Sequence, residues 1–217
     1  MLAAFPVGVH LTLTSEYAGY RWRGLTRGTS LHGKDGFLPA TAAEALDRLD
    51  PEDVRAECRA QIEAALTWGI DVTHLDSHMN IVQDRSDLFG IYLDLAAEYR
   101  LPVRMFSVET TEAQGFRARE RAMARGILFN DHMIYPWPRP TRDVAIETIP
   151  TLSPGVTEIF AHPVLDGEEL RGYGPGFADL RASDAAGLID PALPALLDGH
   201  GIRRISVLEI RALQRAV

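Results

Sequence analysis

The chain has little cysteine, no long apolar run and no excess of basic residues. Cys58 is the only cysteine among 217 residues, so an intrachain disulfide is excluded and a reducing compartment is the default. No apolar stretch approaches the roughly 20 residues that a membrane-spanning helix needs, and the first residues do not form a signal peptide. We therefore expect a cytoplasmic protein that does not enter a membrane.

Acidic residues outnumber basic ones, with 30 Asp and Glu against 22 Lys and Arg, which gives a net charge of -8. Nucleic-acid-binding proteins normally carry a basic patch or stripe, so this balance argues against a nucleic-acid partner. Hydrophobic content of 46% and charged content of 24% are those of an ordinary globular protein. Because no internal repeat, low-complexity tract or linker is present, residues 1–217 predict a single domain.

Strand-like and helix-like segments alternate along the chain. Strands are predicted at residues 7–13, 70–75, 101–106, 155–161 and 202–207. Helices are predicted at residues 51–68, 86–99 and 111–125, from residue 183 onward and at 208–216. Irregular loops are predicted at residues 15–40 and 127–142. The alternation is typical of βα units and a parallel sheet, arranged as either a barrel or an open sheet.

The helix after residue 50 has the clearest boundaries. Asp50 is a natural N-cap, Pro51 fits the first helical position, and Gly69 is a natural stop. Apolar residues recur at every fourth position and predict a stripe that faces the core: Val54, Cys58, Ile62 and Leu66. This place in the stripe favours a buried packing role for the cysteine over a nucleophilic one.

The stretch DVTHLDSHMN, residues 71–80, concentrates residues able to perform chemistry. On an extended backbone, positions two apart point the same way, so His74, Asp76 and His78 can share one face. Two imidazoles and a carboxylate at a strand end suit a divalent metal ion. The alternative is a strand-end turn in which Asp76 and Ser77 bond to the backbone and the histidines are surface residues.

Other polar residues follow separate predicted strands. His10 lies on the first strand, Arg104 on the third, and His162 directly follows the strand at 155–161. In parallel α/β proteins the carboxyl ends of strands converge from distant parts of the sequence, and sites are built there. One histidine at a strand end is usually structural, but three strands that end in histidine, out of seven histidines in total, favour a joint site.

Four segments resemble a known family in the same order over nearly the whole chain: GVHLTLT (8–14), THLDSH (73–78), LPVR (101–104) and GVTEIFAHP (155–163). They are similar to the YdjC-like (ChbG-type) carbohydrate deacetylases. The resemblance implies an α/β fold that is (β/α)-barrel-like and related to polysaccharide deacetylases. It also implies a metal-dependent hydrolase that removes acetyl groups from N-acetylated sugars such as chito-oligosaccharides.

By the same resemblance, His10 and His78 are the histidines that bind a divalent metal ion, Mg²⁺ or Zn²⁺. His74 and Asp76 form a supporting layer that orients these ligands, and Asp76 is also a candidate ligand. An ion held in this way lowers the pKa of bound water and polarises the acetyl carbonyl, which is the chemistry that amide hydrolysis needs.

His162 and Arg104 are the expected catalytic residues. The resemblance places His162 toward the substrate, where an imidazole can protonate the departing sugar amine, and Arg104 near the oxyanion. Aromatic residues of the two loops offer flat apolar surfaces for sugar rings, chiefly Tyr17, Trp22 and Trp137, with Tyr20 and Tyr135 as further members. For each of them, packing within its loop is an equally good explanation.

The family's first strand carries an Asp-Asp pair that supplies a metal ligand and a base, and this sequence contains no Asp-Asp pair. Only residues 2–7 precede Gly8, so we expect the first barrel strand and its helix to be missing. An unpaired strand edge invites pairing with another chain, so we also expect a homodimer or a tendency to aggregate. Some members of the family carry a histidine at the position that Asn80 occupies in this chain. The asparagine side chain can still donate and accept hydrogen bonds there.

Two other functions remain open. The missing Asp-Asp pair favours a non-catalytic sugar-binding or regulatory relative with a degenerate site, whereas the retained His10, His78 and His162 favour the hydrolase. A different metal-dependent hydrolase or isomerase on a barrel scaffold is the third candidate, because a fold does not fix a reaction.

Overall fold

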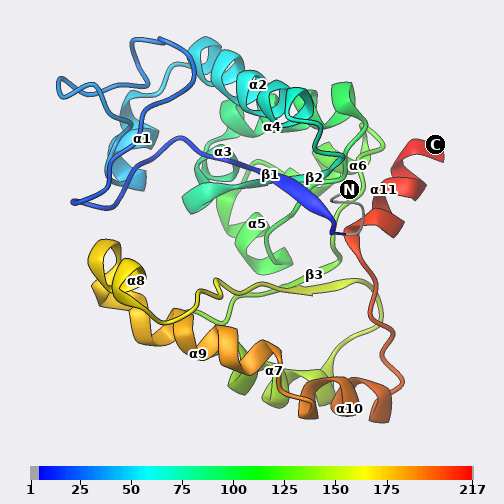
Figure 1. Cartoon of the computed structure of the whole chain (residues 1–217). Coiled ribbons are helices and arrows are strands. Elements are labelled where there is room, and N and C mark those ends of the chain that lie inside the picture. The colour runs from blue at the N-terminus through cyan, green and yellow to red at the C-terminus, as the bar shows by residue number, and fades with distance from the viewer. Residues whose placement is uncertain (1–4, 217) are drawn as a thin grey trace. The chain divides into compact units, whose positions relative to one another are not determined.

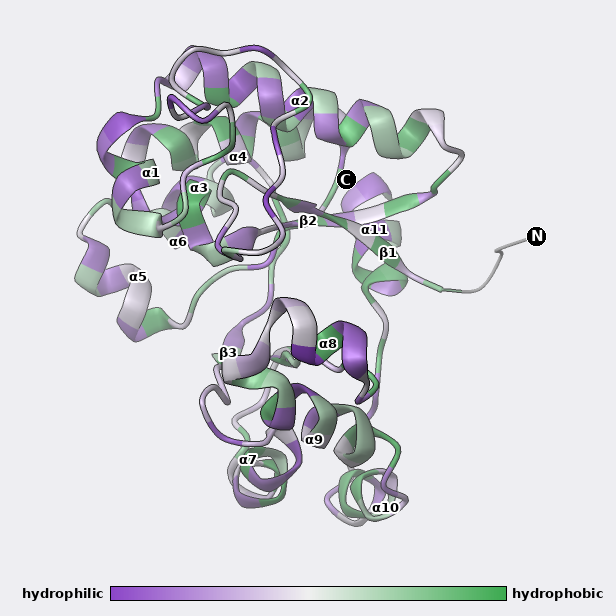
Figure 2. Ribbon diagram, turned by 60° about the vertical axis from the view of Figure 1, so that its left-hand side comes forward, coloured by the Kyte–Doolittle hydropathy of each residue, from purple (hydrophilic) through white to green (hydrophobic). Residues whose placement is uncertain are grey.

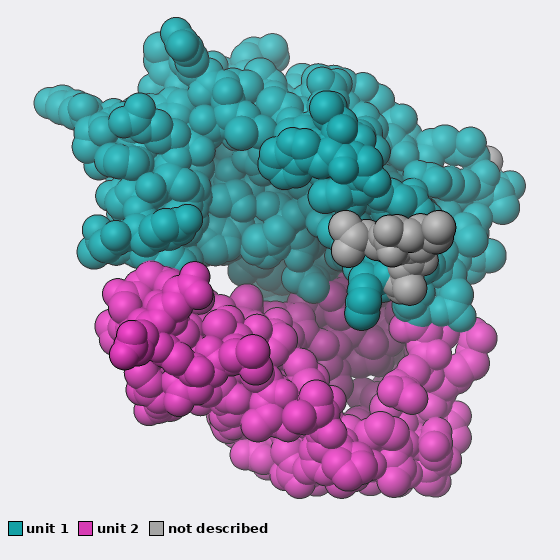
Figure 3. Space-filling model, in the orientation of Figure 1, with its two compact units in different colours: residues 1–129, 206–217 teal, residues 130–205 magenta. Residues whose placement is uncertain are grey.

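In the computed structural model, residues 5–216 are described. The chain forms two compact units, shown in different colours in Figure 3: unit 1 comprises residues 1–129 and 206–217, and unit 2 comprises residues 130–205. The single domain predicted for residues 1–217 stays a prediction. What the sequence predicts for residues 1–4 lies outside the described residues.

Unit 1 combines parallel strands with helices (Figure 1). Its elements are β1 (Val7–Leu11), α1 (Ala42–Arg48), α2 (Pro51–Thr67), β2 (Val72–Ser77), α3 (Ile81–Asp84), α4 (Ser86–Tyr99), α5 (Val108–Gln114), α6 (Ala118–Met123) and α11 (Val207–Ala216). Residues 12–41 contain no helix or strand, as predicted for the loop at 15–40.

The strands of unit 1 form a parallel ladder. β1 pairs with β2 in a register that sets Val9 opposite Leu75 and His10 opposite Asp76. Val103 then bridges Leu75, and Phe129 bridges Val103, both in parallel. Among the described strands, none pairs with β1 on its other side. The homodimer expected from such an edge stays a prediction.

Helix α2 forms where its sequence signals place it. The Asp50 carboxylate accepts a hydrogen bond from the Glu52 amide at 2.9 Å, and Pro51 begins the helix. Figure 2 shows hydrophilic and hydrophobic residues interleaved along α2, which packs against β1 and β2. Val54, Cys58 and Ile62 are fully buried, whereas Leu66 in the last turn is 44% exposed, so the predicted stripe is one position too long.

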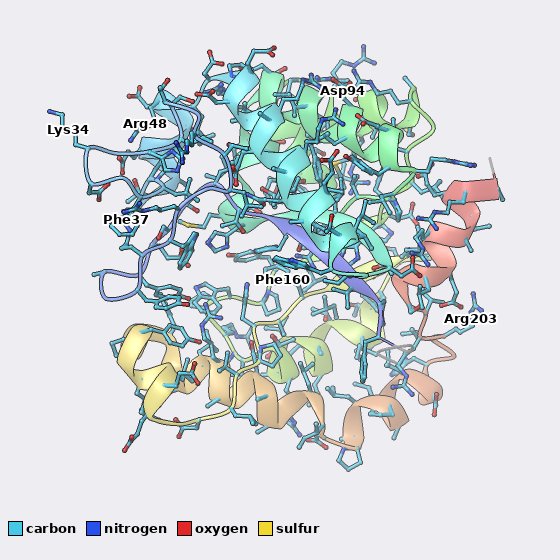
Figure 4. All side chains as sticks on the ribbon, turned by 45° about the horizontal axis from the view of Figure 1, so that its top comes forward. Lys34, Phe37, Arg48, Asp94, Phe160 and Arg203 are labelled. Atoms are coloured by element: carbon cyan, nitrogen blue, oxygen red, sulfur yellow. The ribbon has the colours of Figure 1, made fainter. Side chains whose placement is uncertain are left out.

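Helix α4 has the bounds predicted for it and is tied to the ladder by a buried tyrosine. The Tyr92 hydroxyl donates to the Leu75 carbonyl of β2 at 2.7 Å. On its outer face, Asp94 accepts hydrogen bonds from Arg55 of α2 at 2.8 Å and from Arg125 at 2.7 Å (Figure 4). Exposed ion pairs of this kind contribute at most about 1 kcal/mol, so the buried contacts determine where α4 packs.

Two predicted elements of unit 1 differ from the structure for local reasons. The strand at 101–106 is reduced to the bridge at Val103. The helix at 111–125 is divided into α5 and α6, because Gly115 (φ 75°) and Arg117 (φ 54°) adopt left-handed backbone between them. Left-handed residues end a right-handed helix, and only the glycine adopts this conformation without strain.

The prediction of a strand at residues 202–207 is wrong. Ser206 and Glu209 form a capping box: the Ser206 amide donates to the Glu209 carboxylate at 2.6 Å, and the Ser206 hydroxyl accepts from the Leu208 amide at 3.2 Å. Helix α11 therefore begins at Val207. Arg211 of α11 donates to the Asp71 carboxylate at 2.7 Å, which fixes the helix beside the start of β2.

Unit 2 contains a short parallel pair and several helices. Its elements are β3 (His132–Ile134), α7 (Thr141–Thr148), β4 (Thr157–Ile159), α8 (Glu168–Tyr173), α9 (Ala178–Leu188) and α10 (Ala192–Gly199). β3 falls within residues predicted as loop, and β4 is shorter than the strand predicted at 155–161. No described helix of either unit combines the length and apolarity needed to cross a bilayer.

Cys58 provides a test of the packing of α2. Burial raises the pKa of its thiol, with the neighbouring Glu57 carboxylate adding to the effect, and the side chain is fully buried. We expect no reaction with a thiol-specific reagent in the native protein and full reaction in denaturant, because the thiolate is the reactive form. Colorimetric thiol titration with and without guanidinium measures this. Rapid native reaction would contradict the packing described here.

Candidate functional site

The polar residues of unit 1 gather at the carboxyl ends of its parallel strands. His10 is the fourth residue of β1, and the register of the ladder sets it opposite Asp76 of β2. His78 directly follows β2 and begins the 3-10 turn η1 (His78–Asn80). Arg104 follows the bridge at Val103, and its amide donates to the Leu75 carbonyl at 3.0 Å. The ladder therefore brings together four residues from three separate segments of the sequence.

These side chains, with Glu16, form one continuous chain of contacts. Arg104 Nη1 lies 2.6 Å from Asp76 Oδ2, and His10 Nδ1 lies 2.7 Å from Asp76 Oδ1. His10 Nε2 faces His78 Nδ1 at 3.2 Å, and His78 Nε2 lies 2.9 Å from Glu16 Oε2. We call these five residues the histidine cluster.

The carboxylates fix the protonation pattern of the two imidazoles. An ionised carboxylate only accepts hydrogen bonds, so His10 Nδ1 donates to Asp76 and His78 Nε2 donates to Glu16. In the neutral imidazoles, the nitrogens that face each other at 3.2 Å then both carry lone pairs. Two facing lone pairs repel unless a proton or a cation lies between them. The geometry is therefore suited to binding positive charge.

Asp76 is nearly buried, with 10% of its side chain exposed, yet it stays ionised. Burial alone raises the pKa of this carboxyl group. The hydrogen bond and charge of His10, with the charges of Arg104 and His74, more than offset that effect and hold the pKa below its ordinary value. Because both carboxylate oxygens are engaged, by His10 and Arg104, the arrangement favours Asp76 as a residue that orients His10.

His74 lies on β2, two residues before Asp76, and its ring packs against the backbone of Gly8. A Cβ added at Gly8 would lie 2.4 Å from His74 Cε1, so only glycine allows this approach. His74 Nδ1 lies 2.9 Å from the Thr73 hydroxyl. The charge of His74 helps to lower the pKa of Asp76, which is in keeping with a supporting position.

The backbone directly after His78 is strained. Met79 (φ 46°) and Asn80 (φ 63°) both adopt left-handed conformations, which non-glycine residues rarely do. Asn tolerates this region better than most residues, so Asn80 suits the turn that ends β2. The Thr14 hydroxyl donates to Met79 Sδ at 3.3 Å and links the turn to the chain that follows β1. Strain of this kind concentrates at functional sites.

Aromatic residues of the loop after β1 lie beside the histidine cluster. The Trp22 ring centroid is 6.3 Å from that of His78, and Tyr17 and Tyr20 lie 5.9 and 6.2 Å from Trp22. Tyr20 is 66% exposed, so part of this group is accessible to solvent. Of the predicted substrate-binding residues, Trp22 thus lies next to His78, and Tyr17 packs against Trp22.

His162 and Trp137 belong to unit 2, where they pack against each other with ring centroids 5.6 Å apart. Phe160, labelled in Figure 4, lies 5.4 Å from His162, and Phe177 lies 4.6 Å from Trp137. The His162 amide donates to the buried Asp184 at 3.3 Å. His162 is therefore held within an aromatic group, which we call the unit 2 aromatic cluster.

Glu16 is the member of the histidine cluster that sequence reasoning missed. It stands two residues after the GVHLTLT segment, in a stretch with no periodicity, so only its proximity to that segment marks it. Within the described range 5–216, no three His, Cys, Asp or Glu side chains are arranged to hold one metal ion together. The imidazole pair offers two nitrogen atoms that can bind a metal ion, His10 Nε2 and His78 Nδ1.

Parallel strands with helices between them define a barrel-like α/β protein, and the polar side chains gathered at the carboxyl ends of these strands form its candidate site. The chain belongs to the YdjC-like protein family, whose sequence profile matches residues 1–199. The resemblance predicted from GVHLTLT and THLDSH is therefore confirmed.

Two relatives show how far the similarity extends. A carbohydrate deacetylase of Thermus thermophilus is 43% identical over 95 residues, 44% of this chain and 35% of that protein. A carbohydrate deacetylase of Thermoanaerobacter pseudethanolicus is 27% identical over 165 residues, 75% of this chain and 61% of that protein. The chain thus spans less than two thirds of the length of each of these relatives.

One solved structure confirms the fold. The crystal structure of an Enterococcus faecalis V583 protein, named for cellobiose-phosphate cleavage, superposes with a TM-score of 0.78 and 23% sequence identity. The match covers 95% of this chain and 78% of that one. The predicted barrel-like α/β class is therefore correct.

Proposed function

We propose that this protein is a metal-dependent carbohydrate deacetylase that hydrolyses the acetamide group of N-acetylated sugars or oligosaccharides. The observation that carries the proposal is the imidazole pair, His10 and His78, whose facing nitrogens lie 3.2 Å apart with a carboxylate behind each ring. Relatives named carbohydrate deacetylases, which match 44% and 75% of this chain, support the choice of reaction.

The spacing of the pair fits two ligands of one ion. Nitrogen ligands lie about 2.0–2.1 Å from Zn²⁺, so two of them are roughly 2.8–3.0 Å apart at octahedral angles and roughly 3.3–3.4 Å apart at tetrahedral angles, a span of about 2.8–3.4 Å. The separation of 3.2 Å between His10 Nε2 and His78 Nδ1 falls within that range. Imidazole ligands favour Zn²⁺ over Mg²⁺, which prefers carboxylate and water oxygens. The remaining positions are left to water, substrate or a further ligand.

A bound divalent ion polarises the acetyl carbonyl and lowers the pKa of water, which is the chemistry that the reaction requires. His10 and His78 hold that charge, and Asp76 and Glu16 hold the two rings. Arg104 keeps Asp76 ionised and adds positive charge beside the cluster, where an oxyanion develops.

The reaction adds water to the acetyl carbon, breaks the C–N bond and releases acetate, while the departing amine takes up a proton. We assign the donation of that proton to His162, because imidazole titrates near neutral pH. Tyr17 and Trp22 supply surfaces on which sugar rings stack, and Trp137 remains our prediction for a substrate-binding residue. A cytoplasmic location remains our prediction from the lone, buried Cys58.

Sugar binding without hydrolysis is the second candidate. One observation favours it: the described residues do not provide three acidic, cysteine or histidine side chains around one metal position. A binding protein keeps the aromatic surfaces and the fold but releases no acetate.

The test is acetate release from N-acetylglucosamine and chito-oligosaccharides by the full chain supplied with Zn²⁺ or Mg²⁺. We expect acetate and free amine in equal amounts, and none after chelation. The control replaces each substrate by its deacetylated form. Sugar binding measured by calorimetry without acetate release would instead support the second candidate.

A further inference from the structure

We propose that Glu16 is a positioning residue for His78, equivalent to Asp76 for His10. The site would then be a pair of imidazoles, each held by its own carboxylate. The proposal rests on the proposed function, because that function supplies the cation that His10 and His78 bind. The contact between Glu16 and His78 does not depend on that function. Glu16 Oε2 lies 2.9 Å from His78 Nε2, and Asp76 Oδ1 lies 2.7 Å from His10 Nδ1.

The contact between Glu16 and His78 is shielded from solvent. The side chains are 24% and 19% exposed, so neither is a freely solvated surface group. The Trp22 ring, 6.3 Å from the His78 ring, covers part of the same region. A hydrogen bond to a charged group in such surroundings is stronger than one in open water.

The carboxylate determines how His78 presents its other nitrogen. With Nε2–H donated to Glu16, the lone pair of His78 lies on Nδ1, which faces His10 Nε2 at 3.2 Å. Rotation of an unrestrained ring would turn Nδ1 away from its partner. Glu16 therefore fixes the orientation that makes the two histidines converge, and it adds negative charge near the bound cation.

The backbone on which Glu16 stands is itself fixed. Thr14 and Ser15 are fully buried. The Ser15 amide donates to the Pro39 carbonyl at 2.7 Å, and the Ser15 hydroxyl accepts from the Trp22 amide at 2.8 Å. The two ends of the loop are thereby joined next to Glu16, so the carboxylate is placed before any ligand arrives.

Helix α2 anchors the far part of the same loop. The buried carboxylate of Glu57 accepts hydrogen bonds from the amides of Leu25 and Thr26 at 2.9 and 2.7 Å. Asp53, one turn earlier, accepts from the Ser30 amide at 2.9 Å. A rigid helix thus holds the loop that carries both Glu16 and Trp22, which is the support that a preorganised site needs.

The experiment compares the metal-stripped full chain with Glu16→Ala, Glu16→Gln and the control Glu63→Gln. Glu63 is an exposed glutamate of α2, so its replacement makes the same chemical change elsewhere. Zn²⁺ alone is titrated calorimetrically. Nitrogen-15 NMR of the metal-free proteins reports separately which nitrogen of the His78 ring carries the proton.

We expect Glu16→Ala to weaken Zn²⁺ binding by about 10- to 100-fold, the usual effect of removing a residue behind a metal ligand. Glu16→Gln should recover part of this loss, because its amide oxygen still accepts the Nε2–H bond, and Glu63→Gln should bind as the wild type does. In the metal-free wild type, the His78 ring should carry its proton on Nε2 alone. In metal-free Glu16→Ala, the proton should be shared between Nε2 and Nδ1.

Unchanged affinity in Glu16→Ala, with unchanged ring signals, would overturn the proposal. So would a lowered melting temperature of the metal-free variant with unchanged Zn²⁺ affinity, because that result describes a purely structural residue. If the wild type binds no Zn²⁺, the metal-dependent function fails, and the ring signals still decide the role of Glu16.

Discussion

His78→Ala should reduce acetate release by at least about a hundredfold, more than the 10- to 100-fold typical of residues behind a metal ligand. The substitution removes one of two nitrogen donors, and the nitrogen of His10 3.2 Å away is then left without its partner. It also leaves Glu16 without the imidazole that it contacts at 2.9 Å. Steady-state acetate release, measured with saturating Zn²⁺, gives the effect on kcat/KM.

The fold should survive that substitution, because His78 lies at the end of β2 and its side chain is 19% exposed. His200→Ala is the matched control: it removes an exposed imidazole of unit 2. Far-ultraviolet circular dichroism and the melting temperature should match the wild type in both variants. An enzyme that keeps near-normal acetate release without His78 would contradict the assignment of the site.

Asp76→Asn should lower the free energy of unfolding by about 3 kcal/mol, the effect of removing one partner of a buried ion pair. The change leaves the guanidinium of Arg104, whose side chain is 22% exposed, without the carboxylate oxygen that lies 2.6 Å from it. It also removes the charge that holds His10 with its proton on Nδ1. Equilibrium unfolding in urea measures the change.

The pH dependence of this effect has a definite sign. The pKa of Asp76 is lower in the folded protein than its ordinary value of 3.8, so ionised Asp76 stabilises the fold above that pH. The contribution disappears as the pH falls through the folded-state value. The difference in stability between wild type and Asp76→Asn should therefore be present above pH 3.8 and shrink as the pH falls below it.

A double variant shows whether the loss comes from the contact between Asp76 and Arg104. Arg104→Met combined with Asp76→Asn should be less destabilised than the sum of the two single changes, because each single change removes the same contact, which can be lost only once. Additive losses, or a loss below about 1 kcal/mol in Asp76→Asn alone, would show that the pair contributes little to stability.

Much of unit 1 could be predicted from the sequence because local signals and packing agree there. Asp50 and Pro51 begin α2, and its fourfold apolar spacing places Cys58 in the core. Four of the five residues of the histidine cluster, all but Glu16, were predictable for a similar reason. The carboxyl ends of parallel strands meet, so residues of two separate strand segments, His10 and Asp76, become neighbours.

Other features depend on contacts that have no periodic signal. Glu16 reaches His78 because the loop is joined at Ser15 and anchored by Glu57, a tertiary arrangement that no local pattern encodes. The segment IRRISV at 202–207 resembles a strand, but the capping box of Ser206 and Glu209 begins a helix within it. In both cases a side-chain hydrogen bond decides the local structure.

The most direct test of the account is a calorimetric titration of the metal-stripped chain with Zn²⁺, alongside His10→Ala. We expect binding of one ion per chain in the wild type, because the nitrogens of His10 and His78 converge at 3.2 Å. We expect that binding to be lost in His10→Ala. Absence of binding in the wild type, or binding that His10→Ala leaves unchanged, would contradict the claim that this pair is a metal site.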